Sequence, residues 1–127
     1  MSSQTIEAKF EILDWTEKPY DEPAEGPKLV RITISKRYSG AIEGTGVAEV
    51  LAVQGVEGSG FVASERVVGS LNGRVGSFVI QHGGLADGDQ LSTFGTIVPH
   101  SGTGDLVGIT GLATEAAQGV LTLEYDS

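Results

Sequence analysis

The chain has 127 residues, which suits one domain with a single core. Eight Lys and Arg against 17 Asp and Glu give a net charge of −9, which disfavours nucleic acid and anionic membrane surfaces as partners. The absence of Cys excludes disulfide and thiol chemistry, and no apolar run approaches the roughly 18 residues of a membrane-spanning segment.

The N-terminal segment predicts a half-buried strand over residues 5–13. Ile6, Ala8, Phe10 and Ile12 alternate there with polar side chains. The polar start of the chain lacks the basic and then apolar layout of a signal peptide, so we expect a cytoplasmic protein.

Residues 14–28 predict a proline-rich, acidic, irregular loop. The segment holds three of the four prolines, which cannot pair within a central strand. Trp15 and Tyr20 in this loop suggest a lid over a barrel mouth. The alternative is a solvated loop with Trp15 packed at its base.

Two strands follow, over residues 29–39 and 42–54. The first carries an apolar face composed of Val30, Ile32, Ile34 and Tyr38. In the second, Gly44 and Gly46 alternate with larger residues, which favours a strongly bent strand of the kind that a small closed barrel needs.

The segment 61–82 predicts one long hairpin around Asn72-Gly73, a dipeptide that suits a type I′ turn. If Leu71 pairs with Arg74, Glu65 and His82 become diagonal neighbours on one face, about 5 to 8 Å apart at Cβ. A longer turn would shift the register by one residue and move Glu65 to the other face.

The remaining elements complete an all-β chain. A strand over 91–98 ends at Pro99, a glycine-rich connection spans 100–111, and a last hairpin pairs 112–116 with 120–125. Eight strands with short connections predict an eight-stranded antiparallel barrel over residues 1–127. An interior of this size is either filled by side chains or holds one small ligand.

Several segments resemble the bacterial family known as domain of unknown function 3224. They are Tyr38-Ser39-Gly40, Ile42 to Gly46, Glu65-Arg66-Val67, Gly73-Arg74, Gly76 to His82, Pro99, Ser101 to Leu106, Gly108 and Gly111. That family resembles the allene oxide cyclase-like barrel group, which includes dirigent proteins. The resemblance implies a barrel with a central cavity and a homo-oligomer, but it transfers no catalytic residue.

Glu65 and His82 are the catalytic candidates. Inside an apolar barrel a carboxyl group becomes a usable acid or base near neutral pH, and an imidazole beside it can exchange a proton or bind a ligand carbonyl. The alternatives are a structural salt bridge from Glu65 to Arg66, Arg37 or Arg74, and a half-buried His82 whose hydrogen bonds are satisfied.

A second group of residues is expected to contact a ligand: Trp15, Tyr38, Glu49, Phe78, Ile80 and Gln81. With only His82 and His100 and no close ligand spacing, the sequence disfavours a zinc site, leaving one His with two carboxylates as the alternative. We therefore expect no metal and no cofactor.

These observations predict a small cavity enzyme of the cyclase or isomerase type, which acts on an apolar, oxygen-bearing metabolite. The alternative is a non-catalytic barrel that binds a hydrophobic small molecule. A third possibility is a filled barrel that acts through its surface or its oligomer.

Overall fold

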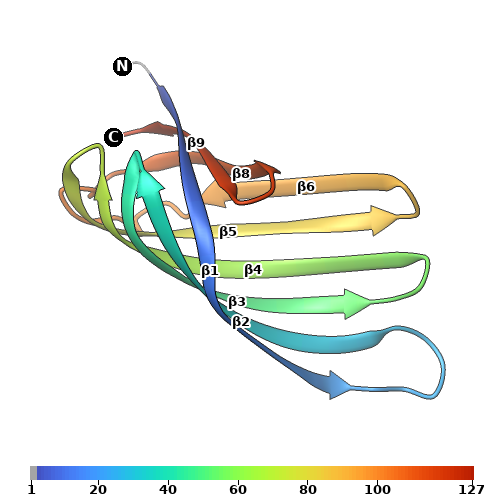
Figure 1. Cartoon of the computed structure of the whole chain (residues 1–127). Coiled ribbons are helices and arrows are strands. Elements are labelled where there is room, and N and C mark those ends of the chain that lie inside the picture. Colours follow the sequence, from blue (N-terminus) through green and yellow to red (C-terminus); the bar gives the residue numbers. More distant parts are fainter. Residues whose placement is uncertain (1–2) are drawn as a thin grey trace.

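A computed structural model describes residues 3–127, apart from the side chain of Ala116, and every regular element in that range is a β-strand (Figure 1). The strands are β1 (Gln4–Asp21), β2 (Lys28–Gly40), β3 (Ile42–Gln54), β4 (Gly58–Leu71), β5 (Arg74–Asp87), β6 (Gln90–Ile97), β7 (Thr103–Gly104), β8 (Thr110–Ala117) and β9 (Val120–Asp126). Over the same range, no helix is long and apolar enough to cross a membrane.

The antiparallel sheet closes into a barrel-like ring of eight strands, as predicted. Strands β1 to β6 pair in sequence order, β6 pairs with β8, β8 with β9, and β9 returns to β1. The two-residue strand β7 lies outside this ring and pairs with the start of β5.

The β4–β5 hairpin has the predicted register. Asn72 and Gly73 form its turn with φ angles of 50° and 83°, as a type I′ turn requires. Leu71 pairs with Arg74, and Ala63 pairs with His82. The turn therefore places Glu65 and His82 on the same face of the hairpin.

The prediction of an irregular loop over residues 14–28 is wrong. Strand β1 continues to Asp21 and pairs with β2, so the connecting loop is confined to residues 22–27. Among the described residues, β1 has a partner on its other side only up to Lys9. Pro19 is tolerated because it lies where β1 has only one partner strand among the described residues. Its missing N–H therefore does not disrupt pairing with a second strand.

A β-bulge at Leu13 decides which side chains of β1 face the interior. Ile12 pairs with Lys36, and Asp14 pairs with the next residue of β2, so Leu13 is the extra residue. A bulge shifts the alternation by one position. Trp15 consequently lies opposite Ile34 on the inner face, and Asp14 does not.

The interior has two halves. One half is filled by a cluster of buried side chains, among them Phe78, Ile80, Ile97 and Leu123. In the other half, residues of β2, β3 and β4 form an apolar wall of Val30, Ile32, Ile34, Ala48, Val50, Ala52 and Ala63.

The barrel is open along one side of its second half. Strand β6 pairs with β8 only through Thr96 and Ile97, and β9 pairs with β1 only over residues 4–9. The long ends of β1 and β6 are therefore not joined to each other. Figure 1 shows these ends spreading apart on the right, beyond the short β8–β9 hairpin.

Candidate functional site

A cavity of about 760 Å³ occupies the open half of the barrel. Its wall is mostly apolar and includes Phe10, Trp15, Ile34, Val50 and Phe61. The turn of the β8–β9 hairpin borders it at Gln118 and Gly119. This size and lining are typical of sites that bind a small molecule.

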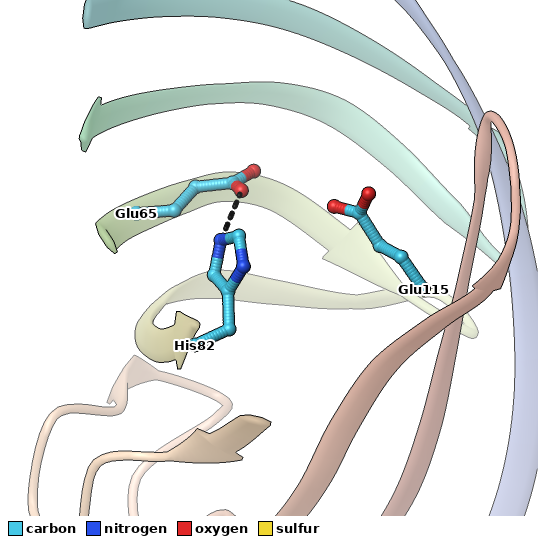
Figure 2. A group of neighbouring side chains, drawn as sticks. All are labelled: Glu65, His82 and Glu115. Atoms are coloured by element: carbon cyan, nitrogen blue, oxygen red, sulfur yellow. Dashed lines mark ion pairs between the residues drawn. The ribbon is translucent and has the colours of Figure 1, made fainter. Parts of the chain in front are cut away.

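Charged side chains form the floor of this cavity, where it meets the filled half of the barrel. Lys36, His82 and Glu115 line the cavity, and Glu65 lies behind them against a second cavity of about 230 Å³. Figure 2 shows the side chains of Glu65, His82 and Glu115 converging from β4, β5 and β8. We call these four residues the charged floor.

Glu65 is the most deeply buried member of the charged floor, with 2% of its side chain exposed. Lys36 Nζ donates a hydrogen bond to Glu65 Oε1 at 3.0 Å, and the Tyr38 hydroxyl donates to Oε2. Gly46 makes room for this group, because a Cβ atom there would collide with Glu65 Oε2. The predicted arginine partners are wrong, since the ion pair of Glu65 is with Lys36.

Lys36 is the cation that joins the two carboxylates. Its side chain is 4% exposed, and Nζ also donates to Glu115 Oε1 at 3.2 Å. The ammonium lies 4.4 Å from the centre of the Phe10 ring, a cation–π distance. Two carboxylates and one ring thus surround a group that has only three N–H donors.

His82 is the incompletely bonded member of the charged floor. Its Nε2 atom is buried, makes no hydrogen bond within the described residues, and lies 3.8 Å from Glu65 Oε1. Burial lowers the pKa of His82, an effect that the nearby charges of Glu115 and Glu65 oppose and that of Lys36 reinforces. The imidazole is therefore neutral at neutral pH and can accept a proton.

Tyr38 supports Glu65 from the filled side of the barrel. Burial raises the pKa of the Tyr38 hydroxyl, and the adjacent charge of Glu65 raises it further. The hydroxyl therefore remains protonated and acts as a fixed hydrogen-bond donor. Tyr38 lies behind the cavity wall, so it positions Glu65 and does not line the cavity.

The composition of the charged floor is one that can hold a metal ion. Glu65, His82 and Glu115 each offer a ligand atom, and these atoms all lie within 4.8 Å of one another. However, the Lys36 ammonium already bonds both carboxylates. A metal ion would have to displace this cation, so the residues favour an ion pair at this position.

The other residues predicted to contact a ligand lie in different environments. Trp15 lines the cavity, from a strand and not from a lid, with about half of its surface exposed. Phe78 is buried in the filled half, and Ile80 borders the smaller cavity. Tyr20 is exposed and lies outside the lining of the main cavity.

Glu49 and Gln81 lie on the outer face of the sheet. Glu49 accepts hydrogen bonds from Arg31 and Thr33, and Gln81 donates one to Ser64. Both residues border an outer groove of about 520 Å³ and not the central cavity. Their side chains therefore belong to the surface of the barrel.

Sequence reasoning missed Lys36 and Glu115. Lys36 is in phase with Ile34 and Tyr38, so strict alternation along β2 places it inside. Glu115 is two residues after the buried Ala113, but a register shift follows Thr114 and weakens that signal. Only closure of the barrel brings β8 to β2 and joins these two residues.

Comparison with known proteins identifies the family. The family profile described as "Protein of unknown function (DUF3224)" matches residues 6–126. The chain is 32% identical to a DUF3224 protein of unknown function from Shewanella oneidensis MR-1; the match covers 98% of this chain and 95% of that crystal structure's chain, with a TM-score of 0.79. No curated protein matches. The chain therefore belongs to the DUF3224 family.

Proposed function

We propose that this protein is a small cavity enzyme of the cyclase or isomerase type that acts on an apolar, oxygen-bearing metabolite. One observation supports this most strongly: a neutral histidine lies at the floor of an apolar cavity, and its buried Nε2 atom has no hydrogen-bond partner among the described residues. The resemblance to the allene oxide cyclase-like barrels points in the same direction, as an analogy of fold.

In this proposal the cavity wall shapes the substrate and the charged floor moves a proton. An apolar wall that holds a flexible molecule in a folded conformation lowers the entropic barrier to ring closure or rearrangement. His82 removes a proton from one atom of the substrate and returns it at another, so the product is an isomer of the substrate. No oxidant or cofactor is needed.

Glu65 acts through His82 and is a positioning residue in this mechanism. Its carboxylate is fixed by Lys36 and Tyr38, and it lies 3.8 Å from the imidazole. A fixed negative charge at this distance stabilises the imidazolium that forms when His82 takes up a proton. The negative charge of Glu65 thus stabilises the protonated intermediate state of the histidine.

The first experiment is to identify the ligand and then to test His82. Native mass spectrometry of gently purified protein, followed by denaturation and small-molecule analysis, identifies what the cavity holds. With that compound as substrate, His82→Gln should lower turnover by roughly 10² to 10⁴, the usual contribution of general acid–base catalysis. His100→Asn, at an exposed position outside the cavity, is the matched control. Equal turnover in both variants would exclude this role for His82.

A non-catalytic binding barrel is the second candidate function. The observation that favours it is the ion pairing of the charged floor, in which Lys36 bonds both carboxylates. In that case the compound is recovered chemically unchanged after long incubation with the protein.

A cytoplasmic location and a homo-oligomer remain predictions of the sequence.

A further inference from the structure

Two of the three N–H donors of Lys36 are already used within the charged floor. Two N–H groups of Lys36 point to Glu65 and Glu115, and the Phe10 ring covers the ammonium at 4.4 Å. The Tyr38 hydroxyl donates to Glu65. An anionic ligand that reaches the floor therefore meets an ammonium that is already paired with two carboxylates.

The groups that remain available are acceptors. Glu115 has 35% of its side chain exposed and lines the cavity, and within the described residues its only hydrogen bond is with Lys36 through Oε1. Neutral His82 keeps one unprotonated ring nitrogen. A ligand that enters the cavity is thus met by a carboxylate oxygen and an imidazole nitrogen.

The charge of the floor is also unbalanced. With both carboxyl groups ionised, Lys36 compensates one of the two negative charges, and neutral His82 compensates neither. No other charged side chain lines the cavity within the described residues. Near the rim, Glu17 accepts a hydrogen bond from Gln54, a residue of the cavity wall, and adds further negative potential.

We infer that the cavity selects apolar molecules that carry a hydrogen-bond donor and rejects apolar carboxylates. Among the donors, it binds a protonated amine more tightly than a hydroxyl. This inference rests on the proposed function and names the chemical class of its ligand. The amine or hydroxyl binds Glu115 and His82, while the apolar part lies against the wall formed by β1 to β4. The net charge of −9 attracts cationic ligands and repels anionic ones before they enter.

The test uses octylamine, octanol and octanoate, which share one apolar chain and differ in the head group. Binding at neutral pH is followed by calorimetry and by the fluorescence of Trp15, the only tryptophan of the chain and a residue of the cavity wall. Octylamine should bind at least about tenfold more tightly than octanoate, with octanol between them, because a charge-assisted hydrogen bond to a carboxylate is stronger than a neutral one.

Two matched variants assign this preference to the floor. Glu115→Gln and Glu49→Gln each remove one carboxylate, but Glu49 lies on the outer face, where it pairs with Arg31. We expect Glu115→Gln to reduce the ratio of amine to carboxylate affinity by about tenfold, and Glu49→Gln to leave it almost unchanged.

Four results would overturn the inference. It fails if octanoate binds as tightly as octylamine. It also fails if Glu115→Gln keeps the preference as fully as Glu49→Gln does, because the overall charge of the protein would then explain the preference. If all three compounds bind equally, the inference fails and the cavity of the proposed function stands. If none of them binds, both fail.

Discussion

Lys36 stabilises the negative charge of Glu65 inside the barrel, where an unpaired charge would be destabilising. Its ammonium is the only cationic group within hydrogen-bond distance of the buried carboxylate of Glu65 among the described residues. Replacing Lys36 with Met should lower the free energy of unfolding by about 3 to 5 kcal/mol, since removal of one partner leaves a buried charge uncompensated. Urea denaturation measures this change.

Two controls separate the ion pair from general effects of the substitution. Lys9→Met removes an exposed lysine and should change the free energy of unfolding by less than about 0.5 kcal/mol. The double variant Lys36→Met with Glu65→Leu should recover most of the lost stability, because the remaining unpaired carboxylate, Glu115, is partly exposed to solvent and not fully buried. A Lys36→Met variant as stable as Lys9→Met would contradict the role of the ion pair.

His82 makes stability depend on pH in a predictable direction. Burial lowers its pKa in the folded protein from about 6.5 in the unfolded chain, and Glu115 on β8, Glu65 on β4 and Lys36 on β2 face it. Below about pH 6.5 the His82 side chain therefore binds a proton in the unfolded chain but remains largely neutral in the folded protein. The free energy of unfolding consequently falls as the pH is lowered from about 6.5 towards the folded pKa, and above that window His82 adds no pH dependence to it.

This dependence is measured by denaturation at a series of pH values. Comparison of the wild-type protein with His82→Asn subtracts the contribution of all other titrating groups. In His82→Asn, the additional loss of stability below pH 6.5 should vanish. His100→Asn should retain it. Identical pH profiles for the wild-type protein and His82→Asn would show that protonation of His82 is not linked to folding.

Single strands and hairpins differ in how far their structure follows from local sequence. The β4–β5 hairpin was predictable because Asn72-Gly73 fixes the turn, and a fixed turn fixes the register of every following pair. That register brings Glu65 and His82 together with no information from the rest of the chain. Half of the charged floor was therefore accessible from the sequence.

The second half of β1 was not predictable in this way. Pro19 and the acidic residues over 14–21 indicate a loop, but the long partner strand β2 supplies a ladder that continues to Asp21 and overrides that preference. The bulge at Leu13 then reverses the alternation and turns Trp15 inwards. No local signal announces a bulge at Leu13, so the alternation of residues 5–13 could not be extended beyond it.

The other half of the charged floor depends on contacts between distant elements. Lys36 on β2 and Glu115 on β8 are separated by 79 positions and meet because the ring closes. Lysine on an apolar strand face usually extends its ammonium to solvent. Only the position of Glu65 and Glu115 around Lys36 shows that this ammonium stays inside.

The whole molecule combines a closed end with an open end, and the two should differ in local stability. Strands β3 and β4 are paired on both sides along their length. Within residues 3–127, β1 beyond Lys9 and β6 before Thr96 each pair with a strand on one side only. Backbone segments with one partner open at a lower free energy than segments with two.

Amide hydrogen exchange followed by mass spectrometry tests this difference. We expect peptides from residues 14–21 and 90–95 to exchange faster than peptides from β3 and β4, because the two free edges border the mouth of the cavity. Octanol should slow exchange at both edges, since a ligand that binds the folded wall stabilises it by mass action. Residues 22–27, a loop that octanol does not reach in this arrangement, are the internal control. Uniform exchange along the strands would mean that the open side is as stable as the closed one, and the cavity would then need another route for ligand entry.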